Sequence, residues 1–235
     1  MANHLIEKAV KTLNYTVKHK FKNQKQRELF DTILANRITF IHGPAGTGKT
    51  FVALKAGLEA MKKKEQHKII ITKPIVEASS PMGHLPGDVR EKTSQYMYSF
   101  HANLKKLLGE AACQRFVADG LIKEVPLNFA RGNTFGDYDK DGNALGEFCI
   151  LDEAQNATVK DVKLFISRMG EKSKIIVMGD NDQTDLKLKV GEKTGLDDAF
   201  KRFEGLDGVG FFQFTDDDIV RDPFLIEVMK RYRTK

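Results

Sequence analysis

The sequence is poor in cysteine and has no long apolar segment. Two cysteines among 235 residues, Cys113 and Cys149, are too few for a disulfide scaffold or a four-ligand zinc site. We therefore expect buried thiols in a reducing compartment. No stretch approaches about 18 consecutive apolar residues, which excludes a membrane-spanning helix. The N-terminus lacks the apolar segment of a secretory leader, so we expect a cytoplasmic protein without a membrane partner.

Linkers and repeats are lacking as well. No internal repeat, low-complexity tract or Pro/Ser-rich segment divides the chain. A length of 235 residues suits one large α/β domain, and we predict a single domain over residues 1–235. The apolar content of 41% and the charged content of 30% are ordinary for a globular protein.

Positive charge is concentrated in the first third of the chain. Residues 1–73 hold 15 Lys and Arg against 5 Asp and Glu, a net charge of +10, whereas the other 162 residues carry −4. Such a basic region is typical of proteins that bind a polyanion such as nucleic acid. A solvated basic surface beside a nucleotide pocket gives the same composition, so charge alone leaves both interpretations open.

Short apolar segments alternate with segments of helical periodicity. Strands are predicted at 38–42, 68–72, 148–151, 174–178 and 209–214. Helices are predicted at 49–64, 89–108, 111–119, 159–169, 196–203 and 223–232. This alternation favours an α/β fold, a mainly parallel sheet with helices on both faces. In such a sheet ligands bind at the carboxyl ends of the strands, where the motifs below fall.

A glycine-rich segment follows the first predicted strand and opens the first predicted helix. It fits the pattern G-x-x-x-x-G-K-[ST] with the residues Gly43, Pro44, Ala45, Gly46, Thr47, Gly48, Lys49 and Thr50. Glycines let the backbone wrap around a phosphate, and the N–H groups of a helix start attract its charge. We predict that these residues bind ATP, with Lys49 at the β- and γ-phosphates and Thr50 on Mg²⁺. A tight turn of chance spacing is the alternative.

Two carboxylates end the third predicted strand along the chain. Asp152 directly follows the apolar residues 148–151, and Glu153 comes next. We predict that Asp152 holds Mg²⁺ and that Glu153 activates water beside the γ-phosphate as a general base. A plain polar exit from the core is the alternative, and the nearby glycine-rich loop favours the catalytic interpretation.

Two glutamines are candidate nucleotide contacts. Gln183 follows the strand at 174–178, and its neutral amide suits a sensor of the γ-phosphate or of the attacking water; an Asx-type turn is the alternative. Gln26 lies upstream of the loop, and its amide matches N6 and N7 of adenine, which favours ATP over GTP; a polar helix face is the alternative. The guanine-reading pattern Asn-Lys-x-Asp is absent.

One arginine precedes the last predicted helix. We predict that Arg221 stabilises charge on the transferred phosphoryl group as an arginine finger, in its own subunit or on a neighbour. A surface salt bridge with Asp217, Asp218 or Asp222 is the alternative, and such pairs contribute little.

The segment 134–146 is predicted as an exposed hairpin insertion. Asp141 and Gly142 give a strong turn signal. The acidic and amide residues at 137–143 superficially resemble a calcium loop, but the bidentate glutamate at its twelfth position is missing. We therefore predict no calcium site there.

Together these motifs resemble the PhoH-like ATPases, whose motifs are similar to those of superfamily 1 helicases. The matching segments are ITFIHGPAGTGKT (38–50), ITKPIVEA (71–78), LPGD (85–88), RGNT (131–134), ILDEAQN (150–156), GDNDQTDL (179–186), KTGL (193–196) and DDIVRDP (217–223). They cover about residues 20–233. Lys73 departs from the arginine found in many members, which keeps the charge but loses a bidentate fork. Residues 72–74, after the second predicted strand, and residues 131–134 are further candidate contacts for a nucleic-acid backbone.

The resemblance implies a RecA-like P-loop NTPase core that uses ATP and Mg²⁺ through Walker A and Walker B motifs. It also implies a ring, usually a hexamer, in which Arg221 serves the neighbour's ATP. Members of the family are linked to RNA, sometimes with a fused ribonuclease domain, of which this sequence shows no sign. A single ATPase core of this kind suits a bacterial protein or one made in a phage-infected cell.

Three functions compete at this point. The favoured one is an ATPase that couples hydrolysis to binding or remodelling of RNA or single-stranded DNA, with helicase-like activity. An ATP-driven switch or remodeller acting on protein partners would hydrolyse ATP regardless of nucleic acid. A small-molecule kinase needs an arginine-rich lid and an acceptor pocket, and a general base at Glu153 argues against it.

Overall fold

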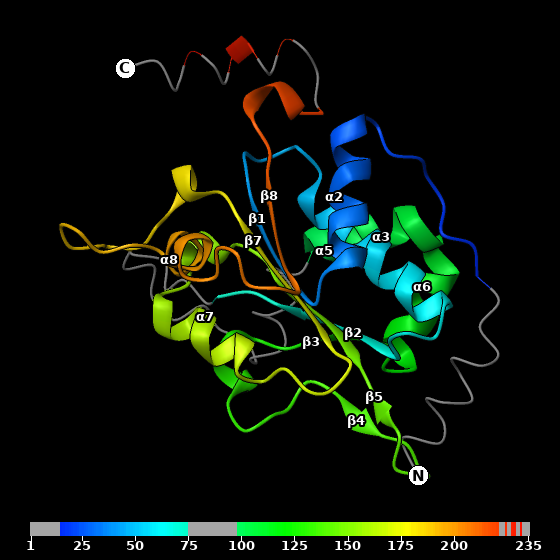
Figure 1. Cartoon of the computed structure of the whole chain (residues 1–235). Coiled ribbons are helices and arrows are strands. Elements are labelled where there is room, and N and C mark those ends of the chain that lie inside the picture. Colours follow the sequence, from blue (N-terminus) through cyan, green and yellow to red (C-terminus); the bar gives the residue numbers. More distant parts are fainter. Residues whose placement is uncertain (1–14, 75–97, 221–223, 225–226, 229–230, 232–235) are drawn as a thin grey trace, which may run out of the picture.

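Six strands form one sheet in which all neighbouring strands are parallel (Figure 1). This computed structural model describes residues 15–74 and 98–220 and positions 224, 227, 228 and 231. Across the sheet the order is β3 (Ile122–Glu124), β2 (Lys68–Thr72), β6 (Glu147–Leu151), β7 (Lys174–Gly179), β1 (Ile38–His42) and β8 (Val209–Gln213). The strand that leads into the glycine-rich loop, β1, therefore lies between β7 and β8.

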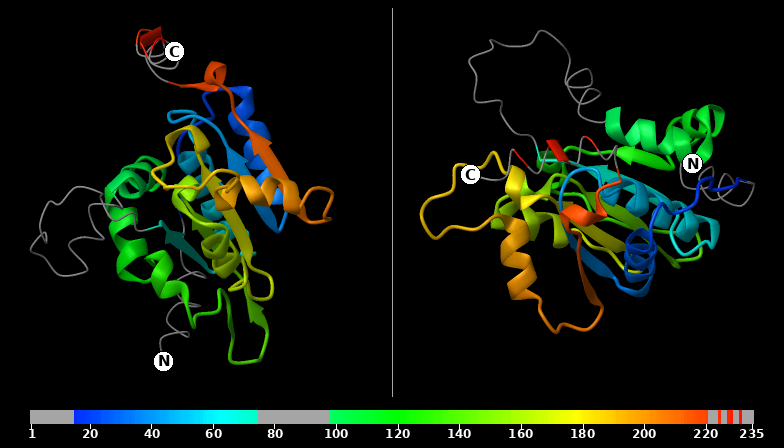
Figure 2. Two further views of the ribbon diagram at one scale, coloured as in Figure 1. Left: turned by 90° about the vertical axis from the view of Figure 1, so that its left-hand side faces the viewer. Right: turned by 90° about the horizontal axis from the view of Figure 1, so that it is seen from above.

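Helices cover both faces of this sheet (Figure 2). One face carries α2 (Gln24–Ala35), α3 (Lys49–Lys62), α5 (Tyr98–Leu108) and α6 (Glu110–Ala118), and the other carries α7 (Val159–Ile166) and α8 (Gly195–Arg202). Successive residues of a strand point to opposite faces. In β6, accordingly, Phe148 and Ile150 join the first core, and Cys149 and Leu151 join the second. The predicted α/β fold, a mainly parallel sheet with helices on both faces, is confirmed.

Side-chain caps fix where the helices near the carboxyl edge begin. The Asn23 side chain accepts a hydrogen bond from the N–H of Gln26 and starts α2. Thr158 and Asp161 form a reciprocal capping box at the start of α7. Each cap satisfies N–H groups that have no partner within the helix, and a residue of this kind typically stabilises a helix by about 1 kcal/mol.

The five predicted strands are present, each with bounds within one residue of the prediction. Among the α-helices and sheet strands that the structure describes, two were missed: β3, which has only three residues, and α2, which begins at Gln24. The predicted helix at 89–108 is described only from Tyr98 onward, and the helix at 223–232 lies mostly outside the described residues. Both cysteines are buried free thiols, as expected.

The segment 134–146 contains two short antiparallel strands, β4 (Asp137–Tyr138) and β5 (Ala144–Leu145). Asp139 holds the turn, because its Oδ1 accepts hydrogen bonds from the N–H groups of Asp141 and Asn143. Over the ranges that are described, no helix combines the length and apolarity needed to cross a membrane.

Candidate functional site

The glycine-rich loop joins β1 to α3 at the carboxyl edge of the sheet. Gly43, Gly46 and Gly48 have positive φ angles of 152°, 90° and 92°. At Gly43 an added Cβ would lie 2.6 Å from Cβ of Phe214, so a larger residue does not fit. Gly48 is the N-cap of α3, which leaves the free N–H groups of the first helical turn next to the loop. The loop thus has the backbone conformation that a phosphate cradle requires.

Lys49, the first residue of α3, folds back over this loop. Its Nζ donates hydrogen bonds to the carbonyl oxygens of Gly43 and Pro44, at 2.6 and 3.0 Å. Burial lowers the pKa of the ammonium group, and the charge of Asp152 opposes that effect. Both hydrogen-bond acceptors of this partly buried cation are neutral carbonyls, so its positive charge is not neutralised by them. The loop therefore favours the binding of an anion.

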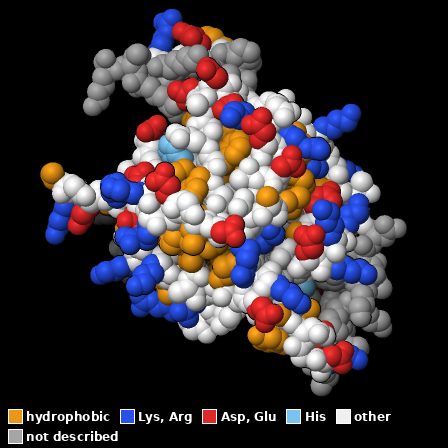
Figure 3. All heavy atoms as spheres, in the orientation of Figure 1, with side chains coloured by type: hydrophobic (Ala, Val, Ile, Leu, Met, Phe, Trp, Pro, Cys, Tyr) orange, Lys and Arg blue, Asp and Glu red, His pale blue; other side chains and the backbone are white. Residues whose placement is uncertain are grey.

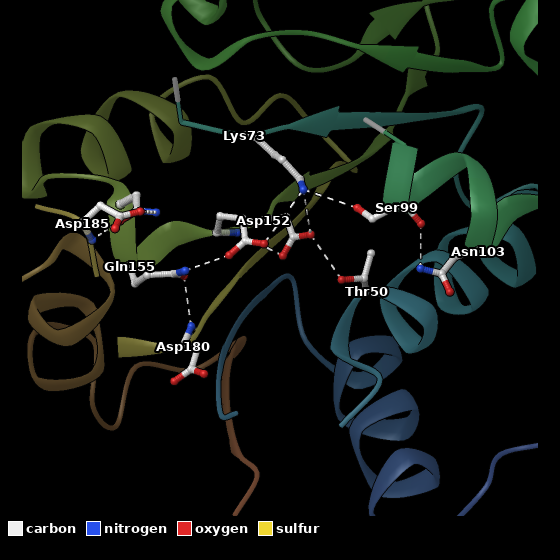
Figure 4. A network of polar contacts seen from close by, with 10 residues as sticks. Thr50, Lys73, Ser99, Asn103, Asp152, Gln155, Asp180 and Asp185 are labelled. Atoms are coloured by element: carbon white, nitrogen blue, oxygen red, sulfur yellow. Dashed lines mark hydrogen bonds and ion pairs between the residues drawn. The ribbon is translucent and has the colours of Figure 1, made fainter. Parts of the chain in front are cut away.

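Thr50 and Asp152 meet across the carboxyl edge, one from α3 and the other from the end of β6 (Figure 4). Thr50 Oγ1 donates to Asp152 Oδ2 at 3.2 Å. Burial, followed by the charge of Glu153, raises the pKa of Asp152 to about 6. No group of three His, Cys, Asp or Glu among the described residues is placed to hold a metal ion. One hydroxyl and one carboxylate nevertheless fit Mg²⁺, which is usually bound by few protein ligands together with phosphates and waters.

Glu153 follows with an unusual backbone conformation. Its φ of 56° and ψ of 36° lie in the left-handed region, which costs a non-glycine residue roughly 1–2 kcal/mol and is often found at functional sites. The Glu153 N–H donates to Asp152 Oδ1 at 3.0 Å, and Glu153 Oε2 accepts from Gln155 Nε2 at 2.7 Å. The side chain is 50% exposed. A carboxylate in this position is anchored on one oxygen and remains accessible to water.

Gln155 and Asp180 connect the ends of β6 and β7 to the loop (Figure 4). Gln155 lies in the 3-10 helix η2 (Ala154–Asn156), is 2% exposed, and accepts a hydrogen bond from the Asp180 N–H through Oε1 at 3.0 Å. Asp180 Oδ2 accepts from the N–H of Ala45 at 3.2 Å. The sequence analysis assigned no role to either residue. The available signal was their position just after two buried strands.

Lys73, the residue after β2, completes this polar network. Its Nζ lies 4.0 Å from Asp152 Oδ2 and 4.0 Å from Glu153 Oε1. It also donates to Ser99 Oγ at 3.4 Å and lies 5.1 Å from the ring centroid of Phe100, within the range of a cation–π interaction. Lys73 therefore links both carboxylates to α5, whereas the sequence analysis considered it only as a candidate contact for nucleic acid.

Gln26 contacts the loop from α2. Its side chain is buried, its Nε2 donates to the Thr47 carbonyl at 2.9 Å, and its Oε1 accepts from the Lys22 N–H at 3.0 Å. An added Cβ on Gly48 would lie 2.5 Å from Gln26 Nε2. Because both ends of the amide have backbone partners in this structure, Gln26 supports the loop, and its contact with adenine stays a prediction.

Gln183 and Arg221 are not brought into the network within the described residues. Gln183 ends the 3-10 helix η3 (Asn181–Gln183) after β7, and its side chain is exposed. Arg221 lies outside the described residues. The preceding residue, Val220, donates its N–H to the Gly46 carbonyl at 3.0 Å, so the segment that leads to Arg221 is attached to the glycine-rich loop.

Comparison with known proteins agrees with these motifs. A family model with the description "PhoH-like protein" matches residues 18–233. The PhoH-like protein of Bacillus subtilis (strain 168) is 37% identical over 211 residues, which cover 90% of this chain and 63% of that protein. Protein PhoH of Escherichia coli (strain K12) is 34% identical over 213 residues, which cover 90% of this chain and 57% of that protein. The chain thus spans about three fifths of the length of these relatives.

Among solved structures, the SWI2/SNF2 ATPase core of Sulfolobus solfataricus in complex with dsDNA aligns with a TM-score of 0.45 and 16% identity. The alignment covers 71% of this chain and 34% of that chain. The Pif1 helicase from Candida albicans aligns with a TM-score of 0.44 and 14% identity over 92% of this chain and 44% of that one.

Proposed function

The chain belongs to the PhoH-like family, and from that premise we propose that it is a Mg²⁺-dependent ATPase. The observation that carries this proposal is the contact between Thr50 and Asp152 beside Lys49, at the rim of the glycine-rich loop. In P-loop NTPases a lysine, a hydroxyl and a carboxylate so arranged serve the phosphates and the metal ion.

Each residue has a distinct task in this proposal. The backbone of residues 43–48 and Lys49 bind the phosphates, and Thr50 and Asp152 hold Mg²⁺, which neutralises phosphate charge when bound. Glu153 takes a proton from the attacking water at Oε1, which lies 4.0 Å from Lys73 Nζ, because Oε2 accepts the hydrogen bond of Gln155. Gln155 thereby fixes the direction in which the general base points.

Two further roles extend the proposal beyond the network. Gln183 senses the γ-phosphate from the end of β7, and Arg221 stabilises charge on the transferred phosphoryl group. A site completed by Arg221 of an adjacent subunit requires an oligomer, and a ring, usually a hexamer, is the arrangement that the family resemblance implies.

We further propose that hydrolysis is coupled to RNA or single-stranded DNA in the cytoplasm. The concentration of positive charge in residues 1–73 supports a polyanionic partner. A switch that acts on protein partners is the alternative, and it predicts turnover that does not respond to nucleic acid.

Phosphate release with and without single-stranded RNA and DNA tests the proposal. Lys49→Ala should abolish turnover, and Glu153→Gln should keep ATP binding, followed with a fluorescent ATP analogue, while losing turnover. Stimulation by either nucleic acid supports the coupling, whereas an unchanged rate supports the protein-directed alternative. Wild-type turnover in the Lys49→Ala variant would overturn the assignment of the site.

A further inference from the structure

A basic groove lies on the second face of the sheet, between α7 and the segment that follows the 3-10 helix η1 (Leu127–Ala130). Its volume is about 470 Å³. The residues around it are Arg131, Gly132, Lys160, Lys163, Leu164, Ser167 and Arg168. Figure 3 shows Lys and Arg side chains gathered over this part of the surface, near α7 in Figure 1. The groove is separate from the carboxyl-edge network, with which it shares no residue.

The outer side of α7 and its C-cap form one wall of the groove. Lys160, Lys163, Leu164 and Ser167 follow the spacing i, i+3, i+4 and i+7, which places them on one side of a helix. Val162 and Phe165 are buried in the second core and fix the helix from behind. At 1.5 Å per residue this stripe is roughly 10 Å long, about the rise of three nucleotides in a strand.

The groove holds four cations and no carboxylate among its lining residues. Arg131, Lys160, Lys163 and Arg168 form no ion pair with any residue that the structure describes, whereas Arg202 on α8 and two further exposed arginines pair with aspartates. Nε and Nη2 of Arg168 donate to the neutral Ser167 hydroxyl, at 3.3 and 3.2 Å. No carboxylate in the groove reduces the mutual repulsion of these four charges, so a bound anion would be stabilised there.

The opposite wall of the groove, at Gly132, leaves room for a ligand to approach the backbone closely. Gly132 has a φ of 82°, and an added Cβ there would meet no atom within 4 Å. Leu164 is the one apolar side chain among the lining residues. Protein interfaces usually carry aromatic and aliphatic anchors at their centre, so this composition favours phosphate over an apolar protein surface.

We propose that this groove binds the sugar–phosphate backbone of RNA or single-stranded DNA. The inference rests on the proposed coupling of ATP hydrolysis to nucleic acid, and it identifies the surface on which the nucleic acid binds. The chain runs from Glu153 through η2 into α7, whose capping box begins at Thr158. The N-cap of the helix that lines the groove therefore lies five residues after the general base.

The test compares two charge-matched double variants. Lys160→Gln with Lys163→Gln removes two charges from the groove, and Lys62→Gln with Lys63→Gln removes two from exposed lysines at the end of α3, within the basic first third. Fluorescence anisotropy measures binding of labelled single-stranded RNA and DNA of equal length across a series of KCl concentrations. Binding of a fluorescent ATP analogue and the thermal midpoint establish that each variant is folded.

The groove variant should bind both nucleic acids about tenfold more weakly, and the slope of log K against log salt should fall by roughly 2. The α3 variant should bind like wild type. An unchanged slope in the groove variant, or an equal loss in the α3 variant, would overturn the groove while leaving the proposed function intact. Failure of wild type to bind either nucleic acid, or equal competition by polyglutamate, would overturn the nucleic-acid coupling itself; ATP turnover remains a separate readout.

Discussion

Strands β2 and β6 carry charged residues at both ends, and the chain satisfies the two groups to different degrees. At the amino ends Lys68 is paired in register with Glu147, and Nζ lies 3.5 Å from Oε1. Glu147 Oε2 also accepts a hydrogen bond from the Gly136 N–H at 3.1 Å. At the carboxyl ends Lys73 stays 4.0 Å from Asp152. In the first group, Glu147 is engaged at both oxygens by buried atoms of the chain, whereas the second group includes a carboxylate, Glu153, that is half exposed to solvent.

The difference in exposure lies at Glu153. The side chains of Lys68 and Glu147 are 7% and 9% exposed and those of Asp152 and Lys73 are 7% and 14% exposed, whereas that of Glu153 is 50% exposed. We name His67, Lys68 and Glu147 the amino-end cluster, and Thr50, Lys73, Asp152 and Glu153 the carboxyl-end cluster. We therefore expect the amino-end cluster to contribute to stability and the carboxyl-end cluster to contribute to ligand binding. Variants of each cluster should separate these two properties.

The largest expected effect is on turnover at the carboxyl end. Asp152→Asn should lower ATP turnover at least about 100-fold, because an amide is a poor magnesium ligand and removes charge from the site. Stability without nucleotide should be kept or improved, since burial raises the pKa of Asp152 and therefore penalises its charged form. Phosphate release and urea unfolding measure the two properties. Normal turnover in this variant would contradict the proposed metal site.

The corresponding substitution in the amino-end cluster should lower the free energy of unfolding rather than the turnover. Glu147→Gln leaves Lys68 buried without its carboxylate, and removing one partner of a buried pair typically destabilises by about 3–5 kcal/mol. Urea unfolding measures this loss, and turnover per folded molecule should change less than about twofold. Replacing both residues, Lys68→Met with Glu147→Leu, should recover much of the stability. A loss of turnover that persists in the folded double variant would contradict the separation of the two clusters, because the amino-end cluster would then also affect catalysis.

The amino-end cluster also predicts a pH dependence of stability. Burial lowers the pKa of His67 to about 4, below the ordinary value of 6.5, although its Nδ1 lies 2.8 Å from the Gly146 carbonyl oxygen. The unfolded chain therefore binds more protons between these values. Through His67 alone, the free energy of unfolding should fall by up to about 3 kcal/mol as the pH drops from 6.5 to 4, whereas the raised pKa of Asp152, about 6, acts in the opposite direction below pH 6. The difference between the wild-type and His67→Gln profiles in urea unfolding isolates the histidine: the stability of wild type relative to the variant should fall as the pH drops, and a constant difference would refute the assignment.

The smallest expected effect concerns the cation of the carboxyl-end cluster. Lys73→Met should reduce kcat about tenfold while KM for ATP changes less than about threefold, because Lys73 orients the carboxylates rather than the phosphates. Lys73→Arg should restore most of the rate. Lys106→Met, an exposed lysine of α5, is the matched control and should leave kcat unchanged. A change in KM alone would assign Lys73 to nucleotide binding.

The sequence predicted the parts of the site that depend on local order. The glycine-rich loop, the strand before it and the helix after it lie next to one another in the chain, so spacing was sufficient. Thr50 and Asp152 could be expected to lie together because parallel strands bring their carboxyl ends to one edge. These features needed only the periodicity of strands and helices.

The rest of the network required geometry that spacing does not contain. Gln155 meets Asp180 only because Glu153 takes a left-handed conformation and η2 follows it. Lys73 reaches the carboxylates because β2 and β6 are neighbours, an order that the sequence analysis did not predict. Of the groove on α7, the sequence indicated only the segment at Arg131; its pairing with Lys160 could not be predicted, because the two residues are 29 positions apart in the chain.

The position of β1 has a consequence for synthesis on the ribosome. Its neighbours in the sheet are β7 and β8, the last two strands in chain order, and Phe214 and Val220 contact the turn that β1 enters. An emerging polypeptide that ends before residue 209 lacks one flank of this strand. Domains form during translation from the part already released. The glycine-rich loop is therefore expected to reach its final packing only after the residues up to Val220 have left the exit tunnel.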